Sequence, residues 1–172
     1  PKGLFPSYRT YVLNQDRQKA DINPFFTGLI VFTLDRIKDQ LTPYQQKLVE
    51  QISSNAKPVF TKFKNRKGRD TYNFWPTDTA QIFPNSGWMN LFNKSQSLPD
   101  DMDDTVITLM ALNANEKTAN NIHLLMQEYI NGGKDKINNT LPSISHLPAY
   151  SVWFGEKMPV DFDISVLSNV LY

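Results

Sequence analysis

Four carboxylates within five positions are the residues of this chain best suited to chemistry. They are Asp100, Asp101, Asp103 and Asp104, in the segment LPDDMDDT at 98–105. So many negative charges repel one another unless they share protons, bind a cation or remain in water. A protonated carboxyl can act as a general acid, and grouped carboxylate oxygens can hold a divalent metal ion. The alternative is that these acids only cap a helix and complement its dipole.

The segment DMDDT at 101–105 resembles the DxDD(T) signature of class II terpenoid cyclases, of the squalene-hopene cyclase and prenyltransferase-like superfamily. The resemblance implies a toroid of inner and outer helices. It also implies that Asp103 donates the proton while Asp101 and Asp104 support it, which makes these three the candidate catalytic residues. The overlapping DDxxD motif of class I terpene synthases lacks its partner motif, because Leu124 stands where Ser or Thr is required. We therefore assign no metal ligands and leave the cofactor open.

Aromatic side chains occur in two long irregular stretches, 64–98 and 132–160. Together with one further acid they are the candidate substrate-binding residues: Tyr72, Phe74, Trp75, Trp88, Trp153 and Asp163. Aromatic faces attract carbocations and stack on sugar rings, and they also anchor loops to a core. A carboxyl pair such as Asp103 and Asp163 is what cleavage of a glycosidic bond requires. An isoprenoid-like small molecule and a glycan are both open as ligands, and so is a non-catalytic binding or interaction module.

The helices that would position these residues are each expected to follow a short acidic motif that occurs three times. It reads DIN at 21–23, DMD at 101–103 and DFD at 161–163, and an apolar segment follows each time. Asp and Asn are preferred helix N-caps, because their side-chain oxygens accept the first free backbone N–H groups. We expect three equivalent helices whose amino ends converge on one opening.

Apolar and amphipathic helices are expected to alternate along the chain. Residues 24–40 have little polar face and are expected to form a helix that Asn23 caps and that is buried nearly all round. Residues from Thr42 onward are amphipathic. The same order returns at 105–112 and 116–129. Inner and outer helices in this order predict an all-α array of helical hairpins that forms part of an α/α toroid, with long aromatic-rich loops.

The whole chain, 1–172, is expected to be one toroid-like domain, since roughly a hundred to two hundred residues per domain is usual. A last apolar helix, from Asp161 or Asp163 to Tyr172, has no polar partner helix after it. Either the domain is incomplete at its C-terminal end, or this helix packs against the first hairpin or another subunit. Self-association through the C-terminal helix follows from the last alternative.

Composition excludes some classes of partner. The net charge is +1, and the basic run at 62–69 is accompanied by no nucleic-acid motif, so we expect no nucleic-acid partner. No apolar stretch reaches the ~20 residues of a membrane span. The absence of cysteine leaves no thiol chemistry and no redox clue to the compartment, which stays open.

Overall fold

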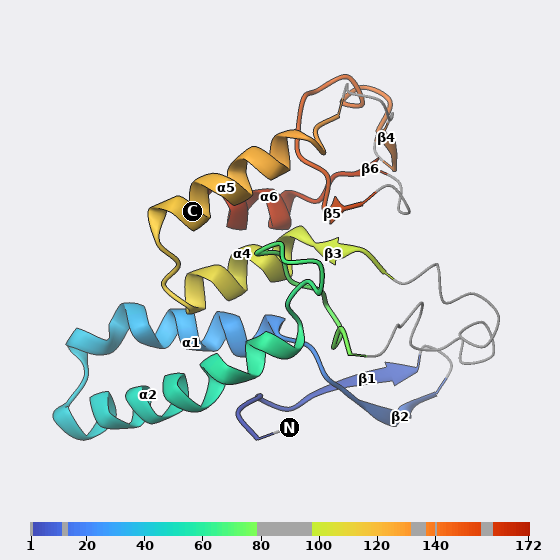
Figure 1. Cartoon of the computed structure of the whole chain (residues 1–172). Coiled ribbons are helices and arrows are strands. Elements are labelled where there is room, and N and C mark those ends of the chain that lie inside the picture. The colour runs from blue at the N-terminus through green and yellow to red at the C-terminus, as the bar shows by residue number, and fades with distance from the viewer. Residues whose placement is uncertain (1, 12–13, 79–97, 132–136, 140, 156–159) are drawn as a thin grey trace.

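The structure is a computed structural model that describes residues 2–11, 14–78, 98–131, 137–139, 141–155 and 160–172. Its helices are α1 (Phe25–Ile37), α2 (Pro43–Ala56), α4 (Met102–Ala111), α5 (Glu116–Gln127) and α6 (Ile164–Leu171), with 3-10 turns η1 (Lys38–Gln40) and η2 (Lys57–Lys62). Its strands are β1 (Ser7–Tyr11), β2 (Asn14–Asp21), β3 (Asp100–Asp101), β4 (Ile137–Asn139), β5 (Trp153–Phe154) and β6 (Val160–Asp161). Figure 1 shows their arrangement.

The prediction of an all-α toroid array is wrong, because the described chain mixes helices with strands. β1 pairs with β2 and β3 with β5 in antiparallel fashion, and β4 pairs with β6 in parallel. The sequence of β2, NQDRQKAD, has no alternation of apolar and polar residues, so its pairing left no period-two signal. The strands β3, β5 and β6 are two residues long and too short to leave one.

The helices begin close to the expected positions, and the expected N-cap is found for α2, α4 and α6. Thr42 forms a capping box with Gln45 at the start of α2, and Asp101 and Asp163 cap α4 and α6. The first helix is the exception, since Pro24 is its N-cap residue and no side chain caps it. Asn23 donates instead to Asp21 Oδ2 and Ser7 Oγ, at 2.8 and 3.1 Å. The three short acidic motifs are therefore not equivalent.

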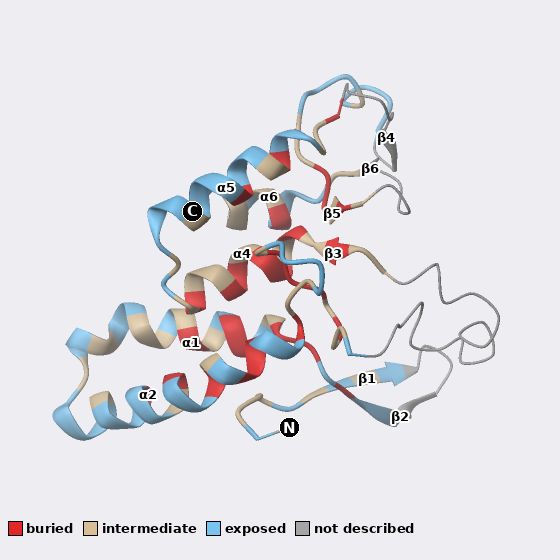
Figure 2. Cartoon of the chain, viewed as in Figure 1, coloured by how far each residue is buried: buried red, intermediate tan, exposed pale blue. Residues whose placement is uncertain are grey.

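Helix α4 lies between two apolar core clusters (Figure 2). The first is formed mainly by α1, α2 and η2 and contains Val31, Ala56, Val59, Phe60, Phe63, Tyr72 and Ala111. The second contains Met102, Ile122, Met126, Val152, Phe154 and Val166. Leu109 of α4 packs against both clusters. This central position of α4 places its acidic start among the loops that follow η2 and α5.

Helix α1 is buried on one face only, which corrects the expectation of a helix buried nearly all round. Thr27, Gly28 and Val31 face the interior, whereas Phe26 and Leu29 are 49% and 40% exposed. The buried face packs closely on α4: a Cβ atom at Gly28 would lie 2.7 Å from Ile107 Cγ2. A glycine at this point lets the two helix backbones approach.

We expect Gly28→Ala to destabilise the fold by about 1–3 kcal/mol, because the added methyl group overpacks the contact with Ile107. In an open helix position the same change would stabilise by about 0.5–1 kcal/mol. Urea unfolding followed by far-UV circular dichroism measures the difference. The control is Thr33→Ala at an exposed position of the same helix, and a Gly28→Ala protein as stable as the parent would contradict the close packing.

Candidate functional site

Backbone pairing holds both long stretches against the acidic motif. The Asp101 backbone N–H donates to the Tyr72 carbonyl at 2.9 Å, and the Met102 N–H donates to the Val152 carbonyl at 2.8 Å. On one side Tyr72 bridges to Asp101, and on the other Trp153 is the antiparallel partner of Asp101. Segments some thirty and fifty residues away along the chain therefore meet at the amino end of α4.

Asp100 serves this junction. Its carboxylate is buried and accepts hydrogen bonds from Asn65 Nδ2 and Thr71 Oγ1, each at 2.5 Å. These two bonds tie the loop after η2 to β3. The carboxylate of Asp100 thus has hydrogen-bond donors from within the chain.

Asp101 is the N-cap of α4. Its Oδ1 accepts from the backbone N–H groups of Asp103 and Asp104 at 2.8 and 3.1 Å. Burial nevertheless raises the pKa of Asp101 to about 6, and the charges of Asp103 and Asp100 add to the effect, whereas the two backbone hydrogen bonds oppose it. The helix-cap interpretation therefore describes Asp101, with the addition that its proton is held unusually firmly.

Asp104 is the most deeply buried of the four acids. It is 1% exposed, and its Oδ1 has no hydrogen-bond partner among the described residues. Burial raises the pKa of Asp104 well above its ordinary value of 3.8, and the charges of Asp101, Asp103 and Asp21 raise it further. Asp21, the last residue of β2, is itself ion-paired with Arg9. The fold thus favours the protonated form of Asp104.

Asp103 lies in a different environment, facing α6. Its Oδ1 accepts a hydrogen bond from Asn169 Nδ2 at 2.7 Å, and its side chain is half-buried. Burial raises the pKa of Asp103, the Asn169 hydrogen bond opposes that rise, and the charge of Asp163 adds to it. Asp163 is exposed and caps α6 by accepting from the Ser165 N–H at 2.7 Å. The structure therefore brings Asp103 and Asp163 near each other, and the charge of Asp103 also acts on Asp101 and Asp104.

The candidate aromatic residues mainly anchor loops. Tyr72 belongs to the first core cluster, and Trp75 is buried with the Arg9 guanidinium 5.4 Å from its ring centroid. Phe74 contacts Trp75 edge to face, with ring centroids 5.2 Å apart. Trp153 is half-buried in β5 beside the second cluster. Trp88 lies outside the described residues.

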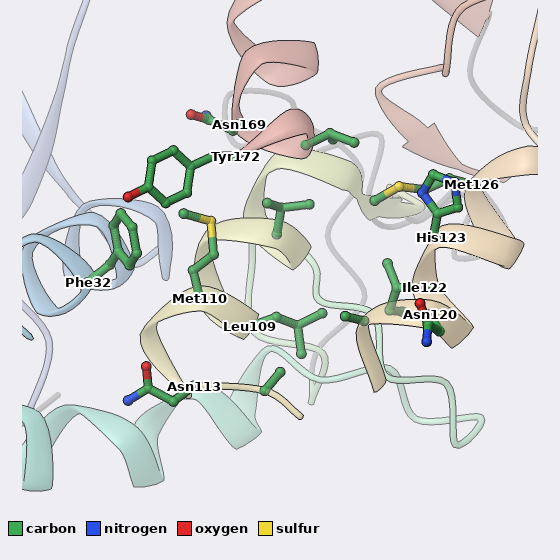
Figure 3. Close-up of a pocket in the computed structure, with 14 residues that line it drawn as sticks. Phe32, Leu109, Met110, Asn113, Asn120, Ile122, His123, Met126, Asn169 and Tyr172 are labelled. Carbon is green, nitrogen blue, oxygen red and sulfur yellow. The ribbon is translucent and has the colours of Figure 1, made fainter. Parts of the chain in front are cut away.

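An apolar groove of about 500 Å³ opens on the α6 side of α4 (Figure 3). Its lining comes from α1, α4, α5 and α6 and from the turn between α4 and α5: Phe32, Val106, Leu109, Met110, Asn113, Ala114, Ala119, Asn120, Ile122, His123, Met126, Asn169, Val170 and Tyr172. We name it the apolar groove. None of the predicted site residues lines it, but Asn169 connects it to the Asp103 carboxylate.

Sequence reasoning missed the apolar groove, although part of its lining has a visible signal. Ala119, Ile122, His123 and Met126 recur at helical spacing on α5, which the sequence indicates as one face of an amphipathic helix. That spacing is equally typical of a helix packed on a core. The sequence cannot tell which part of the face stays uncovered.

No family model, curated protein or solved structure matches this chain. Within the described residues, no three His, Cys, Asp or Glu side chains are grouped so that they could hold a metal ion. Across the same part of the chain, each helix is too short or too polar to cross a membrane. The chemistry of the site is therefore the basis for any statement about function.

The buried acids give a pH dependence whose direction can be worked out. A folded protein in which burial raises the pKa of Asp101 to about 6, from the ordinary 3.8, binds more protons than its unfolded chain between those values. Stability should therefore fall as pH rises from about 4 to 6. We expect Asp104→Asn and Asp101→Asn, alone and combined, to flatten this fall in urea unfolding at pH 4, 5, 6 and 7.

Asp78→Asn is the matched control, since Asp78 is exposed. This variant should keep the slope of the parent protein. An unchanged slope in the Asp101→Asn, Asp104→Asn double variant would contradict the assignment of raised pKa values to Asp101 and Asp104.

Proposed function

We propose that this chain binds an apolar, isoprenoid-like small molecule in the apolar groove. The observation that carries the proposal is the groove itself, whose volume of about 500 Å³ lies within the roughly 300–1,000 Å³ of known ligand pockets. Most of its lining is aliphatic, aromatic or thioether, with a few polar groups such as Asn113, Asn120 and Asn169. Apolar walls with few convergent polar groups suit a ligand that is mostly hydrocarbon.

A glycan is the weaker candidate ligand. Sugar rings bind to exposed aromatic faces, and the structure buries Tyr72 and Trp75 and packs Phe74 on Trp75. The aromatic rings of the groove are those of Phe32 and Tyr172, which contact each other edge to face at 5.3 Å. The Arg36 guanidinium lies over both rings, 6.0 and 5.5 Å from their centroids, where a stacked sugar would have to compete with it.

Filling the groove tests the proposal. We expect farnesol, a neutral isoprenoid alcohol, to bind the parent protein, and Ala119→Phe to weaken that binding by at least about tenfold, because the new ring occupies space that the ligand needs. Isothermal titration calorimetry measures the affinity. Ala119 is exposed on α5, so the larger side chain can be accommodated without disturbing the core.

Asn121→Phe is the control for this experiment. It places the same ring at an exposed position of α5 that does not line the groove. Equal weakening by Asn121→Phe and Ala119→Phe, or no farnesol binding to the parent protein, would contradict binding in the apolar groove. Maltohexaose in place of farnesol tests the glycan alternative.

A second candidate function is acid-initiated chemistry on the bound ligand, with Asp103 as the proton donor. One observation favours it: the carboxyl of Asp103 is hydrogen-bonded to Asn169, which lines the groove. Burial also raises the pKa of this carboxyl. A raised pKa keeps the acid form available at a higher pH, which is what proton donation to an alkene requires. Asp101 would then act indirectly, because it accepts a hydrogen bond from the Asp103 backbone N–H and caps the helix that carries Asp103.

Asp103→Asn separates binding from catalysis. If the parent protein converts farnesol to a hydrated or cyclised product, we expect the variant to lose at least about a hundredfold in rate and to keep its affinity for farnesol, because only the proton is removed. Gas chromatography with mass spectrometry at pH 5 and pH 8 measures turnover, since it resolves a cyclised product that has the same mass as farnesol. Full activity of Asp103→Asn would exclude Asp103 as the donor. Absence of turnover in the parent, with farnesol bound, would favour the non-catalytic binding module.

A further inference from the structure

A second groove, of about 510 Å³, adjoins the apolar groove on the side of α1 and α2. It is lined by Phe32, Asp35, Arg36, Lys38, Glu50, Ser53, Ser54, Lys57 and Asn113. We name it the charged groove. Phe32 and Asn113 line both grooves, so the two meet at these residues.

The charged groove has an excess of cations that are not neutralised by carboxylates. Lys38 is ion-paired with Glu50 at 2.8 Å, and Asp35 accepts a hydrogen bond from Ser53 Oγ at 3.0 Å. Neither Arg36 nor Lys57 forms an ion pair with a described carboxylate, and Lys57 is half-buried. The charge of Asp35 also acts on Lys38, and the lining as a whole has two carboxylates against three cations. An anion in this groove would gain favourable charge contacts.

Arg36 lies where the two grooves meet. Its guanidinium carbon is 6.0 Å from the ring centroid of Phe32 and 5.5 Å from that of Tyr172, both of which line the apolar groove. These cation–π contacts hold the side chain in place while its N–H donors stay available. Asn113, at the turn after α4, has φ = 52°, a left-handed conformation that Asn tolerates, and its side chain borders both grooves.

From this juxtaposition we propose that the ligand is an anionic amphiphile, with its hydrocarbon tail in the apolar groove and its anionic head group at Arg36 and Lys57. The inference rests on the proposed function, because it places the tail where the proposed apolar ligand binds. A carboxylate and a phosphate monoester share the necessary chemistry, since both accept charge-assisted hydrogen bonds from guanidinium and ammonium groups.

The experiment compares three ligands with the same tail: dodecanol below its solubility limit, and dodecanoate and dodecyl phosphate below their micelle concentrations. Calorimetric titration of the full chain should give anions that bind about tenfold more tightly than dodecanol. Lys57→Gln and Arg36→Gln should each weaken anion binding about threefold to fivefold, as expected for a partly exposed ion pair. Lys57→Gln should leave dodecanol binding unchanged, because Lys57 lines the charged groove and not the apolar groove. Added salt should weaken binding of the anions and leave dodecanol unaffected.

Lys117→Gln is the matched control, because Lys117 is exposed on α5 and lines neither groove. Dodecanol binding as tight as that of both anions, or equal weakening of all three ligands by Lys57→Gln, would overturn the head-group assignment and leave the apolar ligand intact. Failure of all three to bind would overturn both proposals. Tighter binding of one anion than the other identifies the head group.

Discussion

The backbone pairing at Asp101 is the constraint on which the rest of the site depends. Tyr72 and Val152, from two long irregular stretches, hydrogen-bond to the first residues of α4, so that loop, helix start and acidic motif are fixed together. Short pairings of this kind are weak alone and become strong when apolar side chains on both flanks are buried. Tyr72 on one side and Phe154 on the other are buried in the two core clusters. Main-chain geometry therefore decides where the carboxylates lie, and burial then decides how tightly each holds its proton.

The acids of this short motif lie in different environments. Successive residues on a helix point about 100° apart, so Asp103 and Asp104 cannot share an environment when α4 is packed on α1 at one side and α6 at the other. Asp104 turns inward and lacks a hydrogen-bond partner for Oδ1, whereas Asp103 meets Asn169. Unpaired buried carboxyls destabilise a fold unless protonated. This is why the fold favours the acid form of Asp104.

The sequence predicted the helices well and the remaining architecture poorly, for physical reasons that particular residues make clear. Thr42 and Asp163 act locally, through hydrogen bonds to backbone groups two or three residues away, and such signals are readable from the chain. Asn23 has the same sequence signature of an N-cap. Its side chain instead donates hydrogen bonds to Asp21 and Ser7 of the β1–β2 hairpin, a contact that only the tertiary structure creates. The β-strands were not predicted, because backbone hydrogen bonds pair them and their side chains show no period-two pattern. The acidic motif was found from its residue types, whereas the grooves depend on which helix faces remain uncovered, information that lies in the packing.

The position of Leu109 affects how the protein would respond to a ligand bound in the apolar groove. This one side chain contacts both core clusters and also forms part of the wall of the apolar groove. A ligand that lies against Leu109 would contact a side chain that packs on both core clusters. Because a ligand that binds only the native state stabilises that state, a ligand in the apolar groove would stabilise the packing of both clusters against Leu109.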